Sequence, residues 1–413
     1  MITPQTGKGL PRTLQTLRGF RDFLPGEALK RQYVIDKIKG VFERYGFDPL
    51  ETPALEYAET LLGKYGDEAD KLLYLFEDNG GRSVGLRYDQ TVPLARVIAQ
   101  YQNDLPLPFK RYQIQPVWRA ENTQKGRFRE FLQCDIDTIG SESPLSDAEI
   151  IDCSLSAFKL LGFSGATMLL NDRTIFDAHR LTKKEIIILD KLEKIGKNEV
   201  VRQLIAAGRT DAVNLLDALQ SAKPTERLWN IIASLKNLGY KEDADFRFDP
   251  FLARGLDYYT SSIFELKTDQ YSAGSLAGGG RYDRLIGQFS SRQLPAVGIA
   301  FGFDRIMETL NELSLLPEST TTTQILVTVF DPTFTKSSEA ITTRLRSAGV
   351  NAETYLEPVK LDRQLKYADR KGIPYVIIQG PEEMEKGVVK LKDMKAKTQE
   401  ELTVDAVIQK LCP

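Results

Sequence analysis

The sequence predicts an α+β protein in which a strand-rich first domain carries a helical insertion and is followed by a small α/β domain. Three observations support this prediction. Two strand-like runs, residues 114–118 and 131–139, flank a polar loop and predict a β-hairpin. Residues 174–245 show helical patterns. From residue 324 onwards strand-like and helical runs alternate, which is typical of an α/β domain with a largely parallel sheet.

The composition is that of an ordinary globular protein without a global basic field. The chain has 413 residues, enough for two or three domains, with 42% hydrophobic and 27% charged residues and a net charge of −2. Any RNA contact would therefore use local patches. The three cysteines, Cys134, Cys153 and Cys412, lack the spacing of a zinc site or a disulfide framework. Because no apolar run is typical of a signal peptide or a membrane span, we expect a cytoplasmic location.

The N-terminal part predicts one long helix followed by an extended segment. Residues 1–16 are polar, and we expect them to be loose. A helix opens at Pro25, carries apolar residues at intervals of three and four, and ends at Gly46. The extended segment that follows contains Pro49 and Pro53, which suit an edge strand.

The next segment predicts two strands and a helix. A turn at residues 78–81 joins the strands, the second strand covers residues 84–88, and the helix starts at Pro93. Asp89 and Thr91 fall between that strand and the helix. A carboxylate at this place could hold an ammonium group, and a helix N-cap explains it equally well.

The predicted hairpin at residues 114–139 carries charge on both arms. Arg119 and Glu121 lie on the outward arm, Arg127 lies at the return, and Phe131 offers a flat face. Arginine can hold a phosphate or carboxylate through two parallel hydrogen bonds, and a base could stack on the phenyl ring. The pattern suits a nucleoside phosphate, although a solvated hairpin with cross-strand ion pairs would also show it. The other charged residues of the hairpin are Lys125, Arg129, Glu130, Asp135 and Asp137.

The later segments combine helical patterns with strands rich in glycine and arginine. In the insertion, Thr182 and Glu185 form a capping-box pattern, and Gly196 should end the helix. The segment RGLDYYT begins at Arg254 and is expected to be a strand. The glycines at residues 278–280 suggest a turn that lets another group approach the backbone closely, and they match neither a P-loop nor a dinucleotide motif.

Several of these segments resemble the histidyl-tRNA synthetases, which are class II aminoacyl-tRNA synthetases. The first helix with its extended segment is similar to motif 1, the hairpin to motif 2, and GIAFGFDR, which puts an arginine at a helix start after a small-residue strand, to motif 3. RGLDYYT and GGGRYD resemble the two signature segments of the family. The resemblance implies a class II α+β catalytic domain with an antiparallel sheet at residues 1–173 and 246–313, a helical insertion at 174–245, a linker at 314–323 and a C-terminal α/β anticodon-binding domain at 324–413. Motif 1 implies a homodimer.

The resemblance implies a histidine pocket. Asp89, Gln90 and Thr91 match the segment that holds the α-amino group of histidine, and Gln133 aids them. Asp137 matches the acidic residue that pairs with the imidazole. The other residues implied for this pocket are Arg119, Arg254, Tyr258, Tyr259 and Tyr282.

The resemblance also implies an ATP site beside that pocket. Arg119 and Arg305 match the arginines of motifs 2 and 3 that contact ATP, and Phe131 matches the aromatic residue that stacks on adenine. Arg254 matches an arginine peculiar to this family, beside the α-phosphate and the substrate carboxylate. The three arginines are therefore the implied catalytic residues. The other residues assigned to ATP are Glu121 and Arg127.

The implied activity is the ATP-dependent ligation of histidine to tRNA(His) through a histidyl-adenylate, with Mg²⁺ accompanying ATP and no metal ion bound tightly by the protein itself. The alternative is a non-catalytic relative, the regulatory subunit of ATP phosphoribosyltransferase. Such relatives usually lack the C-terminal domain and lose catalytic arginines, whereas this chain keeps both. Another class II synthetase would leave RGLDYYT unexplained. The only histidine, His179, is expected to have no catalytic role, and Leu132 stands where many bacterial members have histidine.

Overall fold

The computed structural model describes residues 14–65, 70–254, 258–270, 274–318 and 320–412, so most of the N-terminal segment expected to be loose lies outside the description. The chain forms two compact units. The first holds the chain up to Asp22 together with Val34–Leu315, and the second holds Phe23–Tyr33 and the chain from Leu316. Among the described residues, no helix is both long enough and apolar enough to cross a membrane. The finer domain bounds drawn from the sequence stay predictions.

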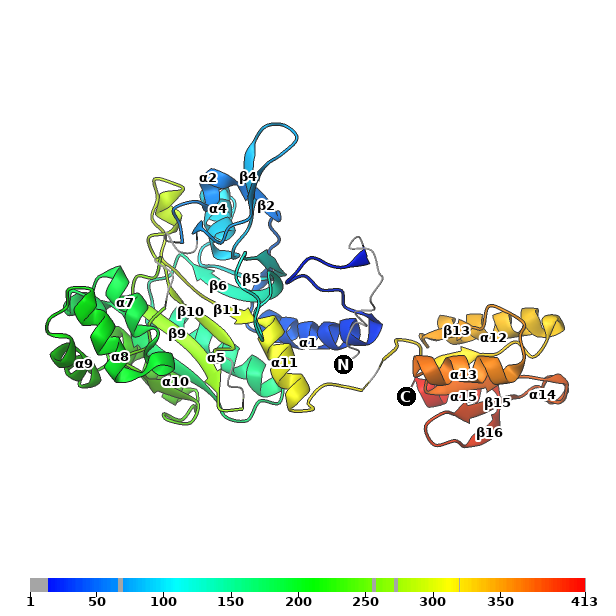
Figure 1. Ribbon diagram of the computed structural model, residues 1–413. Helices are drawn as coiled ribbons and strands as arrows, with labels where there is room; N and C mark the ends of the chain where they lie inside the picture. The colour runs from blue at the N-terminus through cyan, green and yellow to red at the C-terminus, as the bar shows by residue number, and fades with distance from the viewer. Residues whose placement is uncertain (1–13, 66–69, 255–257, 271–273, 319, 413) are drawn as a thin grey trace. The chain divides into compact units, whose positions relative to one another are not determined.

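An eight-stranded sheet is the framework of the first unit (Figure 1). From β5 to β7 all neighbouring strands run antiparallel, and a short parallel strand is added at each edge. The antiparallel sheet implied by the resemblance is therefore confirmed. In sheet order the strands are β1 (Asp48–Pro49), β5 (Phe109–Trp118), β6 (Glu130–Ile139), β11 (Ala296–Gly302), β10 (Ala277–Arg281), β9 (Ser262–Thr268), β7 (Ala166–Asp172) and β8 (Phe246–Phe248).

The register of β6 against β11 leaves space on one face of this sheet. Gln133 pairs with Gly302, Asp135 with Ala300 and Asp137 with Gly298. Alternate residues of a strand point to opposite faces, so the polar side chains of β6 share one face with the smallest residues of β11. The small-residue strand GIAFG thus opens the sheet surface above three polar groups.

The opposite face is the hydrophobic core. The ring of Phe301 on β11 lies 5.4 Å from Phe42 of helix α1 (Pro25–Arg44) and 5.2 Å from Phe158 of helix α5 (Pro144–Leu160). All three rings are fully buried. Burial of aromatic side chains of this size is the main favourable contribution to such a core. The two apolar residues that alternate with the small ones in GIAFG, Ile299 and Phe301, therefore hold the sheet on its helices.

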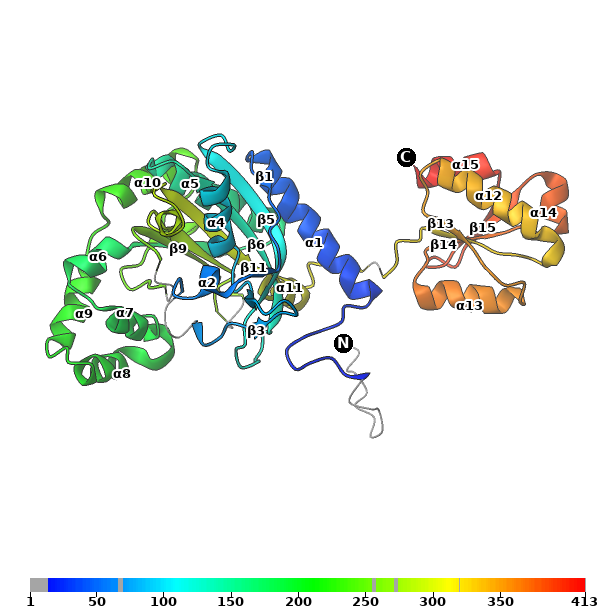
Figure 2. The ribbon, with the colours of Figure 1, turned by 90° about the horizontal axis from the view of Figure 1, so that it is seen from above.

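The segment predicted to be helical does form helices, and the helical run is interrupted at Gly196 as predicted. Thr182 and Glu185 form the expected capping box at the start of α7. Helix α7 ends at Leu189, and the helical segment that follows it is broken by a kink at Gly196, which takes the non-helical angles φ 78° and ψ 161°. Helix α10 packs beside α5, as Figure 2 shows. The helices are α6 (Arg173–Ala178), α7 (Lys183–Leu189), α8 (Leu192–Ala206), α9 (Ala212–Gln220) and α10 (Glu226–Asn237).

A small three-stranded sheet lies at the side of the first unit. It has the order β2 (Leu55–Tyr57), β4 (Ser83–Leu86), β3 (Leu75–Glu77), and α2 (Ala58–Leu61) follows β2 directly. Helix α4 (Thr91–Tyr101) begins two residues before the predicted start at Pro93. Pro93 is tolerated in the first turn, because the backbone N–H groups of that turn have no hydrogen-bond partner within the helix. The strand predicted at residues 84–88 ends at Leu86.

The second unit is an α/β domain, and its sheet is less parallel than expected. Its strand order is β13-β12-β14-β15-β16; β12 runs parallel to both neighbours, whereas β15 and β16 are antiparallel. The alternation of strands and helices was visible in the sequence, but β16 was not predicted. The elements are β12 (Ile325–Val327), α12 (Thr335–Ser347), β13 (Ala352–Thr354), α13 (Leu361–Lys371), β14 (Tyr375–Ile378), α14 (Pro381–Lys386), β15 (Val389–Asp393), β16 (Gln399–Leu402) and α15 (Val404–Leu411).

Candidate active site

Two adjoining pockets lie on the open face of the large sheet. The outer pocket measures about 200 Å³ and the inner one about 150 Å³. Arg119, Gln133, Arg254, Gly278 and Ala300 line both pockets, which makes them two parts of one site. Of the site residues predicted from the sequence, all but Gln90 line one or both pockets.

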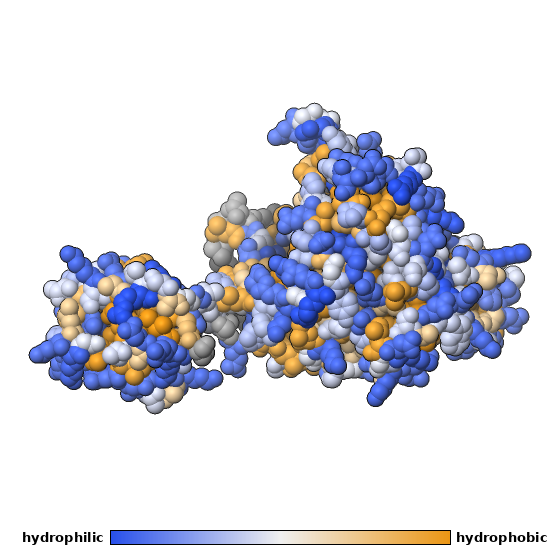
Figure 3. Space-filling view, turned by 180° about the vertical axis from the view of Figure 1, so that it is seen from behind, coloured by the Kyte–Doolittle hydropathy of each residue, from blue (hydrophilic) through white to orange (hydrophobic). Residues whose placement is uncertain are grey.

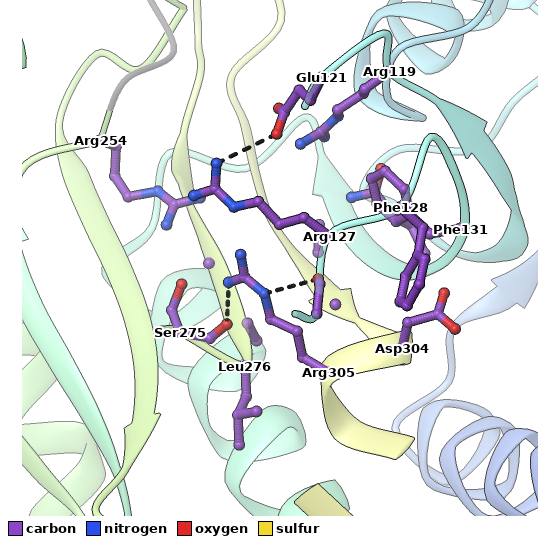
Figure 4. Close-up of a pocket in the computed structure, with 16 residues that line it drawn as sticks. Arg119, Glu121, Arg127, Phe128, Phe131, Arg254, Ser275, Leu276, Asp304 and Arg305 are labelled. Atoms are coloured by element: carbon purple, nitrogen blue, oxygen red, sulfur yellow. Dashed lines mark hydrogen bonds and ion pairs between the residues drawn. The ribbon is translucent and has the colours of Figure 1, made fainter. Parts of the chain in front are cut away.

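Four arginines point into the outer pocket (Figure 4). Arg119 donates from Nε to the carbonyl oxygen of Tyr88 at 3.1 Å, and Arg127 pairs with Glu121 at 3.3 Å. Arg305 lies in the first turn of helix α11 (Phe303–Glu312) and donates to the carbonyl oxygens of Ser275 and Gly126 at 2.8 and 3.4 Å. The fourth is Arg254. So many guanidinium groups around one cavity repel one another unless an anion with several charges binds among them.

Aromatic rings form one side of the outer pocket. The guanidinium of Arg119 lies over the ring of Phe131, with its Cζ atom 5.1 Å from the centroid of that ring. The guanidinium of Arg21 stacks on Phe128, 3.2 Å from the ring centroid. Arg21 also forms an ion pair of 2.7 Å with Asp304. Asp304 also accepts from the backbone N–H of residue 132 at 3.2 Å. These contacts fix the loop side of the pocket next to the flat ring of Phe131.

Asp137 forms the floor of the inner pocket. Its carboxylate makes an ion pair of 2.7 Å with Arg111 of β5 and accepts a hydrogen bond from the Tyr282 hydroxyl. Burial raises the pKa of the Asp137 carboxyl, and Arg111 and the Tyr282 hydrogen bond oppose that rise. A Cβ atom on Gly298 would lie 1.9 Å from the Asp137 carboxylate, so only glycine fits opposite it.

Asp89 lies at the side of the inner pocket and is held by protein donors. Its carboxylate accepts from the hydroxyls of Tyr65 and Tyr258 at 3.2 Å each and from the backbone N–H groups of Thr91 and Val92 at 3.1 Å each. The carboxylate thus caps the first turn of α4, as one of the two sequence readings expected. Gln90 lies apart from the pocket.

The side chain of Gln90 instead joins two strands. It is fully buried and donates to the backbone carbonyl oxygens of Gln115 on β5 and Gln133 on β6 at 2.8 and 3.2 Å. The adjacent Thr91 lines the inner pocket. Gln90 therefore ties the start of α4 to the hairpin and fixes the position of its neighbours Asp89 and Thr91.

Arg254 lies where the two pockets meet. It is not in a strand, as was predicted, but in the irregular segment before β9, and the residues 255–257 of its motif lie outside the described part. Its Nη1 makes an ion pair of 2.7 Å with Glu265 of β9. Burial acts to lower the pKa of Arg254, but Tyr259 and Glu265 outweigh it and hold the pKa above its usual value. The two tyrosines of the motif, Tyr258 and Tyr259, are buried in the inner pocket.

The three glycines of GGGRYD form strand β10 rather than the predicted turn. Gly278 and Gly279 explain why. A Cβ atom on Gly278 would lie 2.3 Å from the Arg254 guanidinium, and one on Gly279 would lie 2.1 Å from the carbonyl oxygen of Gly298. The glycines thus allow the Arg254 side chain to cross β10. The prediction that another group approaches the glycine backbone closely is confirmed, whereas the predicted turn is wrong. Tyr282, just beyond β10, lines the inner pocket wall.

The site residues that were not assigned from the sequence include Arg111, Asp135 and Glu265. Asp135 stands two residues before Asp137 on the same strand, so the two-residue repeat of a strand could have placed it in the pocket. Arg111 and Glu265 depend on pairings between strands, which the sequence does not show. Among the described residues, no group of three or more His, Cys, Asp or Glu side chains could hold a metal ion.

Comparison with known proteins gives consistent matches along the chain. The family model "Histidyl-tRNA synthetase" matches residues 19–185 and 173–306, and the model "Anticodon binding domain" matches residues 324–412. Histidine–tRNA ligase of Cytophaga hutchinsonii is 39% identical over 95% of this chain and 98% of its own length. Histidine–tRNA ligase of Wolinella succinogenes is 41% identical over 92% of this chain and 94% of its own length. The crystal structure of histidyl-tRNA synthetase from Nostoc sp. PCC 7120 superimposes with a TM-score of 0.84 at 30% identity, covering 96% of this chain and 98% of that one.

Proposed function

Since this chain belongs to the histidyl-tRNA synthetase family and is a histidine–tRNA ligase, we propose how its two pockets divide the reaction between them. The inner pocket takes the side chain and amino group of histidine. The outer pocket takes ATP. Arg254, which lines both, stands beside the bond that forms between the histidine carboxylate and the α-phosphorus.

The outer pocket supplies positive charge for the first step. A carboxylate oxygen of histidine forms a bond to the α-phosphorus while the bond to the bridging oxygen breaks, and pyrophosphate leaves. Both reactants are anions, so Arg119, Arg254 and Arg305 lower their repulsion, and each preorganised group of this kind is worth roughly 3–4 kcal/mol when removed singly. Phe131 supports the adenine. No nucleophilic side chain is required, because histidine supplies the nucleophile.

The inner pocket supplies the choice of amino acid. Asp137, held by Arg111 and Tyr282, accepts a hydrogen bond from an imidazole N–H. An amino acid without such a donor would leave one acceptor site of the buried carboxylate without a hydrogen bond, which is the kind of mismatch that gives strong discrimination. The enclosed walls formed by Tyr258, Tyr259 and Tyr282 limit the size of the side chain.

The second step transfers histidine to the ribose hydroxyl at the end of tRNA(His), which attacks the adenylate carbonyl and releases AMP. The second unit matches an anticodon-binding domain, and we propose that it recognises the far end of the same tRNA. Mg²⁺ would reach the site with the ATP phosphates. The carboxylates that line the outer pocket, Glu121 and Asp304, already pair with Arg127 and Arg21, so the protein fits a metal held mainly by the nucleotide. A cytoplasmic location also stays a proposal.

We further propose that two copies of the chain pair through the small three-stranded sheet. Four large apolar side chains are 41–52% exposed there, Leu55 and Tyr57 on β2 and Leu75 and Phe76 on β3. Figure 3 shows apolar area on the first unit below its protruding hydrophilic tip. An apolar patch of this kind marks a protein contact. Replacing Leu75 and Phe76 with lysine should give monomers in sedimentation, and an unchanged sedimentation coefficient would exclude this surface.

The observation that carries the proposed division is that Arg254 lines the arginine-rich outer pocket and the carboxylate-floored inner pocket at once. The regulatory alternative needs only the inner pocket. Charging of a tRNA(His) transcript with labelled histidine tests the proposal, and the Arg305→Ala variant is the matched control. Histidine should bind both proteins, whereas only the wild type should charge the transcript. Equal charging by both would exclude the outer pocket as the ATP site.

A further inference from the structure

A segment near the N-terminus lies against the loop side of the outer pocket, and the reaction above gives it no role. Residues 17–21, here called the strap, form neither a helix nor a strand and belong to the first unit. The carbonyl oxygen of Gly19 accepts hydrogen bonds from the backbone N–H groups of Arg129 and Glu130, at 2.9 and 3.4 Å. The strap therefore binds the return arm of the β5–β6 hairpin where that arm enters β6.

Gly19 allows the strap to come this close to the hairpin. Its φ angle is 89°, and a Cβ atom there would lie 2.7 Å from Cγ of Arg129 and 2.9 Å from Cγ2 of Thr123. Phe20 adds an edge-to-face contact with Tyr74, with 6.3 Å between the ring centroids. The strap thus packs closely on both sides of the hairpin loop.

Arg21 connects the strap to the start of helix α11. Its guanidinium stacks on Phe128, and its Nη2 atom donates to Oδ1 of Asp304 at 2.7 Å. The other oxygen of that carboxylate, Oδ2, accepts from the backbone N–H of Leu132 at 3.2 Å. Asp304 is 4% exposed. One buried carboxylate therefore joins the strap, β6 and α11.

Arg21 lies behind the wall of the outer pocket. Phe128 and Asp304 line that pocket, whereas Arg21 does not. Figure 4 shows Phe128 and Asp304 on the same side of the pocket as Phe131. Arg21 is thus placed to act on a bound nucleotide only through its two neighbours.

The contacts of Asp304 fix the residues proposed to hold ATP. Arg305 follows Asp304 in the chain, and Phe131 precedes Leu132. The spacing between the Arg305 guanidinium and the Phe131 ring therefore depends on the bond from Leu132 to Asp304. The Asp304 carboxylate also lines a pocket for a polyanion, and its charge would repel the phosphates unless a cation balances it. Arg21 supplies such a cation and holds the aromatic wall through its stack on Phe128.

We propose that Arg21 is a positioning residue for ATP, which holds Phe128 and Asp304 so that the adenine-stacking ring and Arg305 keep the spacing that the nucleotide needs. The inference rests on the proposed assignment of ATP to the outer pocket and deepens it. Neither Phe128 nor Asp304 lines the inner pocket, so the loss of Arg21 should affect ATP and not histidine.

Pyrophosphate exchange on the full chain, with ATP and histidine varied separately, tests the proposal. Arg21→Ala should lower kcat/KM for ATP by about 10- to 100-fold, up to the cost of a misplacement of about 1 Å, while the KM for histidine stays within about twofold. Arg21→Lys keeps a cation for Asp304 but loses the planar stack, so its loss should be smaller. In an Asp304→Asn background, Arg21→Ala should cost much less, because both changes remove the same link.

Arg31→Ala is the matched control. It removes another arginine that stacks on a phenylalanine, Phe23 at 3.9 Å, from a place that lines neither pocket, so both substrates should behave as in the wild type. A loss in Arg31→Ala as large as that in Arg21→Ala would overturn the proposal.

Three other results would overturn it as well: wild-type kcat/KM for ATP in a folded Arg21→Ala protein, an equal loss for ATP and histidine, or effects of Arg21→Ala and Asp304→Asn that simply add. Thermal unfolding midpoints show whether each variant is folded. If the alanine variant does not fold, Arg21→Lys takes its place, and wild-type kcat/KM for ATP in that variant would overturn the proposal. Exchange with histidine in the wild type must be present first, and its absence would refute the proposed function instead.

Discussion

Replacing Arg254 with alanine should slow adenylate formation more than any other single change in the two pockets. The guanidinium lies where the pockets meet and can contact both the attacking carboxylate and the α-phosphate. Its benefit should be larger in the transition state, where the charge on the phosphoryl oxygens is redistributed. We therefore expect kcat for pyrophosphate exchange to fall by about 10²–10³, the effect of losing one preorganised donor.

The same substitution also has a structural cost, which must be separated from the catalytic one. Arg254 pairs with Glu265 at 2.7 Å, and their side chains are 21% and 13% exposed. Removing one partner of a fully buried pair costs about 3–5 kcal/mol. Here the cost should be nearer to about 1–2 kcal/mol, because Arg254 is partly exposed and Lys267 stays 3.4 Å from Glu265 as a second cation.

Two further variants distinguish these effects. Arg254→Lys keeps a positive charge for Glu265, so it should regain stability while kcat stays well below that of the wild type, because a point charge cannot hold two anions. Glu265→Gln leaves Arg254 in place but removes the carboxylate that orients it, so kcat should fall while the KM for ATP stays similar. Exchange rates are compared with unfolding midpoints on the same samples. A folded Arg254→Ala protein with near wild-type exchange would refute the reasoning.

Three other predictions follow from the pockets and the second unit. Asp137→Asn should raise the KM for histidine far more than that for ATP in pyrophosphate exchange, and equal effects would place Asp137 outside the amino-acid pocket. Removing everything after Thr323 should leave amino-acid activation partly intact and abolish efficient charging of tRNA(His); undiminished charging would remove the RNA role of the second unit. Burial raises the pKa of Asp135, so the folded state favours the protonated carboxyl. The protonated carboxyl makes its full contribution to the free energy of unfolding below the unfolded-state pKa of about 3.9. That contribution is lost as the pH rises through the folded-state pKa. Asp135→Asn should therefore gain stability relative to the wild type as the pH is raised from about 4 to 8, and a gap in unfolding midpoint that stays constant would contradict this.

The sequence was informative where a local pattern reflects a local structure. Apolar runs around a polar loop predicted the β5–β6 hairpin, and the apolar spacing after Pro25 predicted α1. The capping box at Thr182 was also visible, because its partners are three residues apart. The residues that the resemblance implied for the site all line one or both pockets, apart from Gln90, and their roles stay predictions.

Features set by contacts between distant segments could not be read from the sequence. Arg111 reaches the site through its cross-strand pairing with Asp137, which depends on the register of β5 against β6. Arg254 was expected in a strand because the tyrosines that follow favour strands, but its side chain must cross Gly278 to reach Glu265. Tertiary contacts outweigh local propensity at such a place. The antiparallel strands β15 and β16 were likewise hidden, because a strand's direction depends on its neighbour.

The central claim is that the two adjoining pockets activate histidine with ATP. ATP–pyrophosphate exchange, measured on the wild type with each of the twenty amino acids in turn, tests it most directly. We predict exchange with histidine and none with the other nineteen, because the imidazole both fits between the tyrosines of the inner pocket and brings an N–H group to Asp137. A folded protein that binds histidine yet shows no exchange with any amino acid would contradict the claim and favour a regulatory role.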